Sequence, residues 1–95
     1  EVETVSLFET WTAEIPSRLS PWMSSNEVLS LIDKLDLPTL VDQFKAKNDH
    51  GRTVKVGHWL RRMLESGMSV GAGWTLSSKA AKGGNVYMPV PPPAG

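Results

Sequence analysis

The segment from Thr53 to Val90 constrains the fold most strongly, because its residue pattern changes from helical to strand-like. Its first part has apolar residues at helical spacing: Val56, Leu60, Met63 and Leu64. Thr53 is placed to cap the start of this run, and Gly67 is placed to end it. We therefore expect a helix from Thr53 to Ser66 with one side buried.

The opposite face of this predicted helix is mainly basic. It carries Lys55, His58, Arg61, Arg62 and Glu65. An apolar face opposite a basic face is typical of a helix that packs on a core and presents its charges to a partner. A solvated face on which Arg62 and Glu65 neutralise each other is the alternative.

Two short strand-like stretches follow, at 74–77 and 85–90, joined by residues 78–84. We expect an antiparallel hairpin whose tip carries Lys79 and Lys82. Trp74 and Tyr87 would pack this hairpin against the helices. A basic helix followed by such a hairpin predicts a mainly α fold with a small antiparallel β-hairpin, the winged helix-turn-helix.

Three further helices are predicted upstream. Capping-box spacing at 6–9 opens a helix that runs to about Glu14, and the same spacing at 24–27 opens a helix over 25–35. Pro38 begins a third helix, which ends in the basic segment 45–47. Residues 48–52 would be a turn, with Gly51 supplying the conformational freedom. The helix from Thr53 then occupies the position of a recognition helix.

Charge is distributed unevenly, although ten basic and ten acidic residues give a net charge of zero. Residues 1–44 hold two basic and eight acidic residues, a formal charge of −6, whereas residues 45–95 hold eight basic and two acidic residues, or +6. Such asymmetry indicates a polyanionic partner for the second half. A charge separation without functional meaning is the alternative.

The length suits one domain. We expect a single winged-helix domain over 1–90, with an N-terminal helix and connector at 1–23, the helix-turn-helix and wing at 24–90, and a Pro-rich tail at 91–95. The chain does not begin with methionine, so we expect a fragment of a longer protein. It has no apolar run of the ~18 residues that span a membrane, and we predict no membrane partner.

Composition also limits the chemistry. Cysteine is absent, which excludes a disulfide framework and a Cys-based zinc site and fits a cytoplasmic location. His50 and His58 lack the spacing of a metal pair, and the serines and glycines match neither a nucleophile elbow nor a P-loop. We therefore predict no cofactor, no metal and no catalytic residue, so that the chain itself is not an enzyme.

Several of these segments together resemble a known family. The residues are 38–47, the Gly-containing turn, 56–64 with its Gly57-x-x-Leu60 step, Gly73-Trp74 and 83–87. They are similar to the winged-helix domain at the C-terminal end of phage and plasmid primase-helicases. The resemblance implies that the helix pair and hairpin bind origin or template DNA beside a helicase motor.

We therefore predict double-stranded DNA binding by an accessory domain of a larger replication or mobile-element protein. The expected contacts are Lys45, Lys47, Arg52, Lys55, His58, Arg61, Arg62, Lys79 and Lys82. Two alternatives stay open. The same scaffold could bind another protein or domain through its acidic N-terminal half or its hairpin edge, or it could be a structural domain of a larger enzyme.

Overall fold

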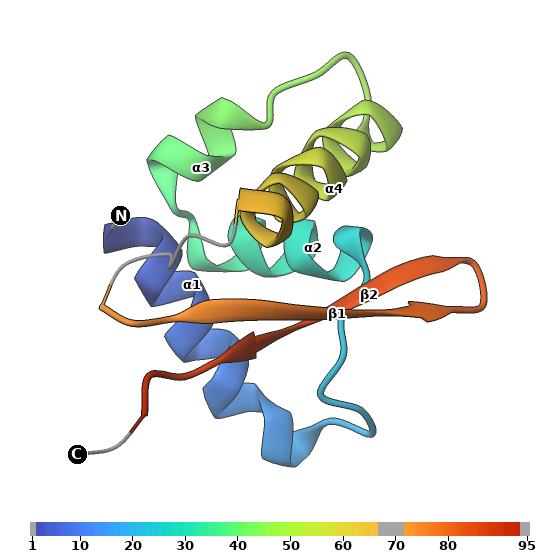
Figure 1. The fold of residues 1–95 in the computed structure, drawn as a ribbon. Coiled ribbons are helices and arrows are strands. Elements are labelled where there is room, and N and C mark those ends of the chain that lie inside the picture. Colours follow the sequence, from blue (N-terminus) through green and yellow to red (C-terminus); the bar gives the residue numbers. More distant parts are fainter. Residues whose placement is uncertain (1, 67–71, 94–95) are drawn as a thin grey trace.

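The computed structural model describes residues 2–66 and 72–93, and its elements are mainly helical (Figure 1). In order they are α1 (Val2–Glu14), the 3₁₀ helix η1 (Ile15–Ser17), α2 (Ser25–Leu35), α3 (Pro38–Gln43), α4 (Asp49–Ser66), β1 (Thr75–Ala81) and β2 (Gly84–Val90). The predicted class, a mainly helical chain with a two-stranded antiparallel hairpin, is confirmed. Gly67, expected to end the last helix, lies outside the described residues, as do Glu1, Ala94 and Gly95.

The hairpin is longer and its turn tighter than the sequence pattern indicates. The two strands pair from Thr75 with Val90 to Ala81 with Gly84, so only Lys82 and Gly83 form the turn. The predicted loop over 78–84 is therefore wrong. Gly83 and Gly84 have φ angles of 92° and 134°, which glycine adopts at little cost, and this allows the chain to reverse so sharply.

The hairpin joins the N-terminal part of the chain through one additional bridge. The backbone N–H of Met23 donates to the carbonyl oxygen of Tyr87 (2.9 Å), and the N–H of Tyr87 donates to that of Met23 (2.8 Å). The connector after η1 thus adds a short bridge to the outer edge of β2. Met23 is buried in the core at this bridge.

The core lies between the helices and one side of the hairpin. Among the described residues, it contains Leu7, Phe8, Trp11, Met23, Val28, Leu29, Leu31, Ile32, Leu40, Phe44, Val56, Leu60, Trp74 and Tyr87. The ring of Phe8 packs edge-on against Trp11 and Trp74, with centroids 5.8 and 6.1 Å apart. These contacts fix the hairpin on α1, which passes behind it in Figure 1, and Trp74 and Tyr87 play the packing role predicted for them.

One of the three predicted helix caps is confirmed and two are wrong. At α2 the predicted capping box is confirmed, since Ser24 Oγ accepts from the N–H of Glu27 and the Glu27 carboxylate accepts from the N–H of Ser24. The box predicted at 6–9 is wrong, because α1 already begins at Val2. Thr53 is also not a cap, since α4 begins four residues earlier at Asp49.

The turn between the last two helices is displaced accordingly. α3 ends at Gln43, so Lys45 and Lys47 lie in the turn and not in a helical end, contrary to prediction. Asn48 Oδ1 accepts a hydrogen bond from the N–H of Gly51 (2.8 Å), which satisfies one of the unpaired donors at the start of α4. Gly51 and Arg52 therefore belong to the first turns of α4.

The start of α3 is capped from a distant part of the chain. The Glu3 carboxylate accepts hydrogen bonds from the backbone N–H groups of Thr39 (3.1 Å) and Leu40 (3.0 Å). Interaction with the Thr39 side chain, together with these N–H groups, lowers the pKa of Glu3 below its usual value. A negative charge at this position also interacts favourably with the helix dipole. Glu3 thus ties α1 to α3.

We predict that Glu3→Gln lowers the melting temperature at neutral pH. Because the folded-state pKa of Glu3 is lowered, its contribution is fully present above the unfolded value of about 4.3 and is lost as the pH falls through the folded-state pKa. The difference between Glu3→Gln and the unmodified protein should therefore disappear in acid. Thermal melts across a pH series, with the exposed Glu9→Gln as the charge-matched control, test this. Equal melts of all three proteins at neutral pH would contradict it.

Candidate nucleic-acid interface

Helix α4 presents the two faces expected from its sequence. Val56 and Leu60 are completely buried, and the half-buried ring of Trp59 lies 5.1 Å from that of Phe44, centroid to centroid. The basic side chains of the opposite face are all exposed: Lys55, His58, Arg61 and Arg62. Burial of the apolar stripe therefore holds this basic face toward solvent.

Gly57 lets α4 approach the start of α2 closely. A Cβ atom added at this position would lie 3.1 Å from Ser25 Oγ, closer than side chains normally pack. Thr53 Oγ1 lies one turn earlier on α4 and is 3.5 Å from Asn26 Oδ1, while also donating to the carbonyl of Asp49 (2.9 Å). The small side chains at this contact bring the first turn of α2 beside the basic face of α4.

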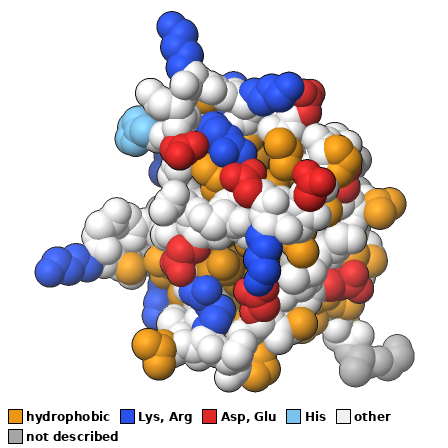
Figure 2. All heavy atoms as spheres, turned by 180° about the vertical axis from the view of Figure 1, so that it is seen from behind, with side chains coloured by type: hydrophobic (Ala, Val, Ile, Leu, Met, Phe, Trp, Pro, Cys, Tyr) orange, Lys and Arg blue, Asp and Glu red, His pale blue; other side chains and the backbone are white. Residues whose placement is uncertain are grey.

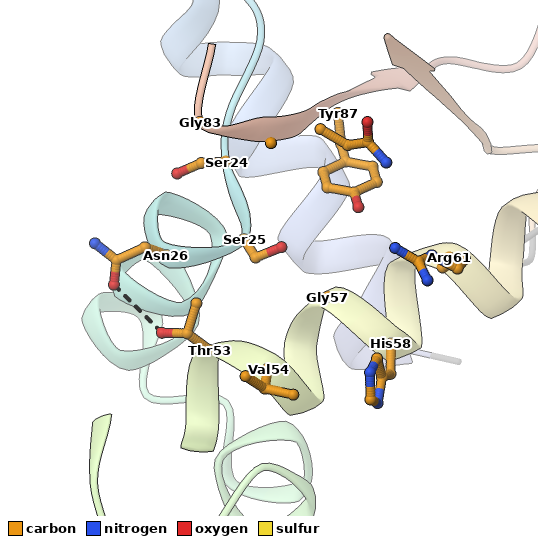
Figure 3. Close-up of a pocket in the computed structure, with 12 residues that line it drawn as sticks. Ser24, Ser25, Asn26, Thr53, Val54, Gly57, His58, Arg61, Gly83 and Tyr87 are labelled. Atoms are coloured by element: carbon orange, nitrogen blue, oxygen red, sulfur yellow. Dashed lines mark hydrogen bonds between the residues drawn. The ribbon is translucent and has the colours of Figure 1, made fainter. Parts of the chain in front are cut away.

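A polar groove of about 500 Å³ lies between the start of α2, the outer side of α4 and the hairpin turn (Figure 3). In the close-up, His58 and Arg61 from α4 and Tyr87 from β2 border the same space. The lining residues are Ser24, Ser25, Asn26, Thr53, Val54, Gly57, His58, Arg61, Gly83, Gly84, Asn85 and Tyr87.

The chemistry of this lining suits a polar and negatively charged surface. Hydroxyl and amide groups both donate and accept hydrogen bonds, whereas a guanidinium only donates. The groove contains no Asp or Glu among its lining residues. Side chains of these types form most contacts to phosphate and sugar in protein–DNA complexes.

Four Lys and Arg side chains have no hydrogen bond, ion pair or ring contact within the part of the chain that the structure describes. They are Lys47, Arg61, Arg62 and Lys82. Two lie on α4, one in the turn before it and one at the hairpin turn. His50 and His58, both on α4, have no such contact among the described residues either. Glu65 does not pair with Arg62 despite its helical spacing, so the neutralised helix face considered from sequence is not observed.

Arg52, in contrast, is held by an internal ion pair. Its two terminal nitrogens donate to the two carboxylate oxygens of Asp33 on α2, at 3.1 and 2.6 Å, and it lies 3.6 Å from Asp49. The hydrogen bonds to Asp33 raise the pKa of Arg52. A DNA contact by Arg52 would compete with this pair, so the position predicted as a contact joins α4 to α2 instead.

Lys45 and Lys55 are also partly engaged. Lys55 Nζ donates to the carbonyl oxygen of Lys45, and Lys45 Nζ lies 3.1 Å from the Asp42 carboxylate. Both remain exposed, beside a second hollow of about 230 Å³ that is lined by Gln43, Phe44, Lys55, His58 and Arg62. His58 therefore lies between this hollow and the main groove.

Lys79 and Lys82 do not share the hairpin tip as predicted. Lys79 lies within β1, paired with Val86, and its Nζ is 4.7 Å from the centre of the Trp22 ring, a cation–π contact. Lys82 alone belongs to the turn. The structure thus places His58 and Arg61 in the lining of the groove, with Lys82 next in sequence to the lining residue Gly83, and it gives Lys79 a packing contact on the hairpin.

Four of the seven carboxylates described in residues 2–44 are in ion pairs, and the pair between Asp42 and Lys45 is one of them. Glu14 lies 3.3 Å from Lys34, Glu27 lies 2.8 Å from Arg18, and Asp33 binds Arg52. On the face drawn in Figure 2, acidic and basic side chains are interspersed. Pairing therefore reduces the acidic field that the sequence alone indicates, and the unpaired cations gather around α4.

Several groove residues were missed by sequence reasoning. Ser24, Ser25 and Asn26 were recognised only as the start of a helix, and Asn85 and Tyr87 only as part of a strand. Their place in the groove follows from the packing of α2 against α4 and of β2 against both the connector and α2. Gly57, whose small size allows α2 and α4 to approach closely, is the one feature of the local sequence that indicates this packing.

Within residues 2–66 and 72–93, His, Asp and Glu form no cluster that could hold a metal ion. No helix in the same described part is long and apolar enough to cross a bilayer.

Comparisons with protein families, curated proteins and solved structures give no match to this chain. The resemblance to primase-helicase winged helices therefore stays a prediction from the sequence.

We predict different effects on stability for Arg52, which is ion-paired, and Arg61, which is not, two of the three arginines of α4. Arg52→Ala should lower the free energy of unfolding by about 1 kcal/mol, the upper end for exposed pairs, because water screens the 43% exposed Asp33. Arg61→Ala should change it by less than about 0.5 kcal/mol. Urea unfolding of each variant, with Asp33→Ala and the double variant completing a cycle, measures the pair directly. Additive effects of Arg52→Ala and Asp33→Ala would contradict the assignment.

Proposed function

We propose that this chain binds double-stranded DNA as a winged helix-turn-helix. α3 and α4 form the helix pair, α4 is the recognition helix, and the β1–β2 hairpin is the wing. The single observation that carries the proposal is the position of the unpaired cations. All four lie on α4, on the turn before it, or at the hairpin turn, and Arg61 lines a groove that has no acidic lining residue.

The dimensions of α4 fit this role. Its 18 residues give a length of about 27 Å at 1.5 Å per residue, and the major groove, about 12 Å wide, admits one helix. Arg61 and Arg62 have the forked donors that pair with guanine edges or phosphates. His58 lies one turn before them on the exposed face. These three side chains are therefore the proposed contacts within the major groove.

Lys47 and Lys82 would contact the phosphate backbone on either side of α4. Both are exposed and unpaired, at the helix-pair turn and the hairpin turn. Phosphate contacts fix the register of a protein on the duplex without reading sequence. Lys45 and Lys55, which both remain exposed, would add to the positive electrostatic potential on the side of α4 that is near α3.

The cellular setting follows from the resemblance alone. The similar winged helices belong to phage and plasmid primase-helicases, so we propose an accessory domain of a cytoplasmic replication or mobile-element protein. The chain would then hold DNA for a catalytic module elsewhere in the parent protein, without itself being an enzyme.

A protein partner at the hairpin is the second candidate. Among the residues that the structure describes, β1 pairs with β2 along one edge only, and an unpaired strand edge can accept another strand. Such pairing would be insensitive to salt, whereas binding to phosphates weakens steeply as salt is added. A salt series therefore separates the two functions.

We predict that the domain binds a duplex with a dissociation constant of about 10⁻⁴ to 10⁻⁶ M at physiological salt, the range of nonspecific binding. Arg61→Ala and Lys82→Ala should each weaken binding. Lys82→Ala should also reduce the slope of log K against log salt by about 0.9, the value for one lost phosphate contact. Fluorescence anisotropy of a labelled duplex over a salt series provides the measurement.

Lys34→Ala is the matched control, because it removes one positive charge that lies at the far end of α2 beside Glu14. Its affinity and salt slope should equal those of the unmodified domain. Thermal melts should be unchanged for Arg61→Ala and Lys82→Ala, whose side chains have no partner to lose among the described residues. Equal losses of affinity in Lys34→Ala and Arg61→Ala would refute the proposed interface.

A further inference from the structure

A loop at the end of the molecule away from α3 and α4 presents a leucine to solvent. This loop joins η1 to α2 (Figure 1), and the side chain of Leu19 has a relative exposure of 110%, so it contacts almost nothing. A single exposed apolar residue is ordinary on a protein surface. Two further observations distinguish this one.

The loop is held rigidly around Leu19. Arg18 Nε donates to the carbonyl of Ser20 (3.0 Å), and Arg18 Nη2 donates to the carbonyl of Trp22 (3.3 Å) and to the Glu27 carboxylate (2.8 Å). The N–H of Trp22 donates to Ser20 Oγ (3.2 Å). These bonds fix the backbone on both sides of Leu19, so little conformational entropy is lost when the side chain docks.

A hollow of about 260 Å³ lies directly beside this loop. Its apolar part is formed by Met23 and Leu31, and Ser30 also lines it. Its remaining lining is charged: Glu14, Arg18, Glu27 and Lys34. A water molecule occupies about 30 Å³ in the liquid, so the hollow has the volume of roughly nine waters. This volume is sufficient for the four carbons of a leucine side chain.

We propose that two copies of this chain associate through this face, with Leu19 of each copy seated in the hollow of the other. Leu19 directly follows Arg18, which lines the hollow, so the exposed side chain starts one residue from the rim of the hollow. A two-fold axis through such a face brings each projection onto the opposite hollow.

The charges of this face suit a second copy better than a partner of one sign. The rim carries two carboxylates and two cations, already arranged as the pairs Arg18–Glu27 and Lys34–Glu14. A rim whose charges already balance offers no net attraction to a strongly charged partner. The whole chain has a formal net charge of zero, so two copies do not repel each other strongly.

The hollow beside the loop and the groove at α4 share no lining residue, so this association does not fill the groove. The dimer would thus carry two copies of the candidate interface. The inference does not rest on DNA binding, and it is tested without DNA.

The test is sedimentation equilibrium of the unmodified protein and of Leu19→Ser over about 10 μM to 1 mM, the range of weak association. The mass should rise with concentration from 10.4 kDa toward twice that value for the unmodified protein. Leu19→Ser should dimerise at least about 100-fold more weakly, since burying each of the two leucines contributes about tenfold or more.

Val2→Ser is the matched control, because Val2 is also largely exposed but lies at the start of α1. It should dimerise like the unmodified protein, and melts of both serine variants should match that of the parent at low concentration. A constant mass of 10.4 kDa for the unmodified protein would overturn the proposal. Equal dimerisation of Leu19→Ser and the parent would also overturn it.

Discussion

The packing of α4 on α2 is the contact on which the rest of the structure depends. Val56 and Leu60 supply its buried apolar side, Gly57 allows the two backbones to approach, and the Arg52–Asp33 pair joins them at the start of α4. One rotation of α4 about its axis is compatible with these contacts. In that orientation the basic face of α4 is exposed and lies beside the hairpin. The groove is therefore a consequence of core packing.

The ion pairs explain how a chain without net charge can present a basic surface. Arg18, Lys34 and Arg52 are held by carboxylates of the N-terminal half, and these pairs neutralise both members locally. The cations left unpaired in the described part of the chain gather on α4 and on the two turns beside it. Ion pairing therefore leaves the unpaired positive charges concentrated around α4. The charge totals of the two sequence halves do not show this concentration.

What could be predicted from the sequence was local. The Ser24–Glu27 capping box and the apolar stripe of α4 are read from residues within one or two turns of each other, and both are confirmed. The cap that Glu3 provides for α3 joins residues 36 apart, and the contact of Lys79 with Trp22 depends on where the connector folds back. The groove was likewise not predictable, because α2, α4 and the hairpin contribute to it from separate segments.

The start of α4 was missed for a different reason. Asn48 and Thr53 are both good caps, and the sequence pattern alone favoured the one nearer to the apolar run.

The central claim is that DNA binds at α4 and the hairpin turn, and amide chemical-shift mapping tests it most directly. A ¹⁵N-labelled domain titrated with duplex DNA should show its largest shifts at the amides of Gly57, Arg61 and Gly83, with small shifts in the loop around Leu19. Saturation of these shifts should require more DNA as salt is raised. Largest shifts in α1 or in the loop around Leu19, or no shifts at millimolar duplex, would contradict the account.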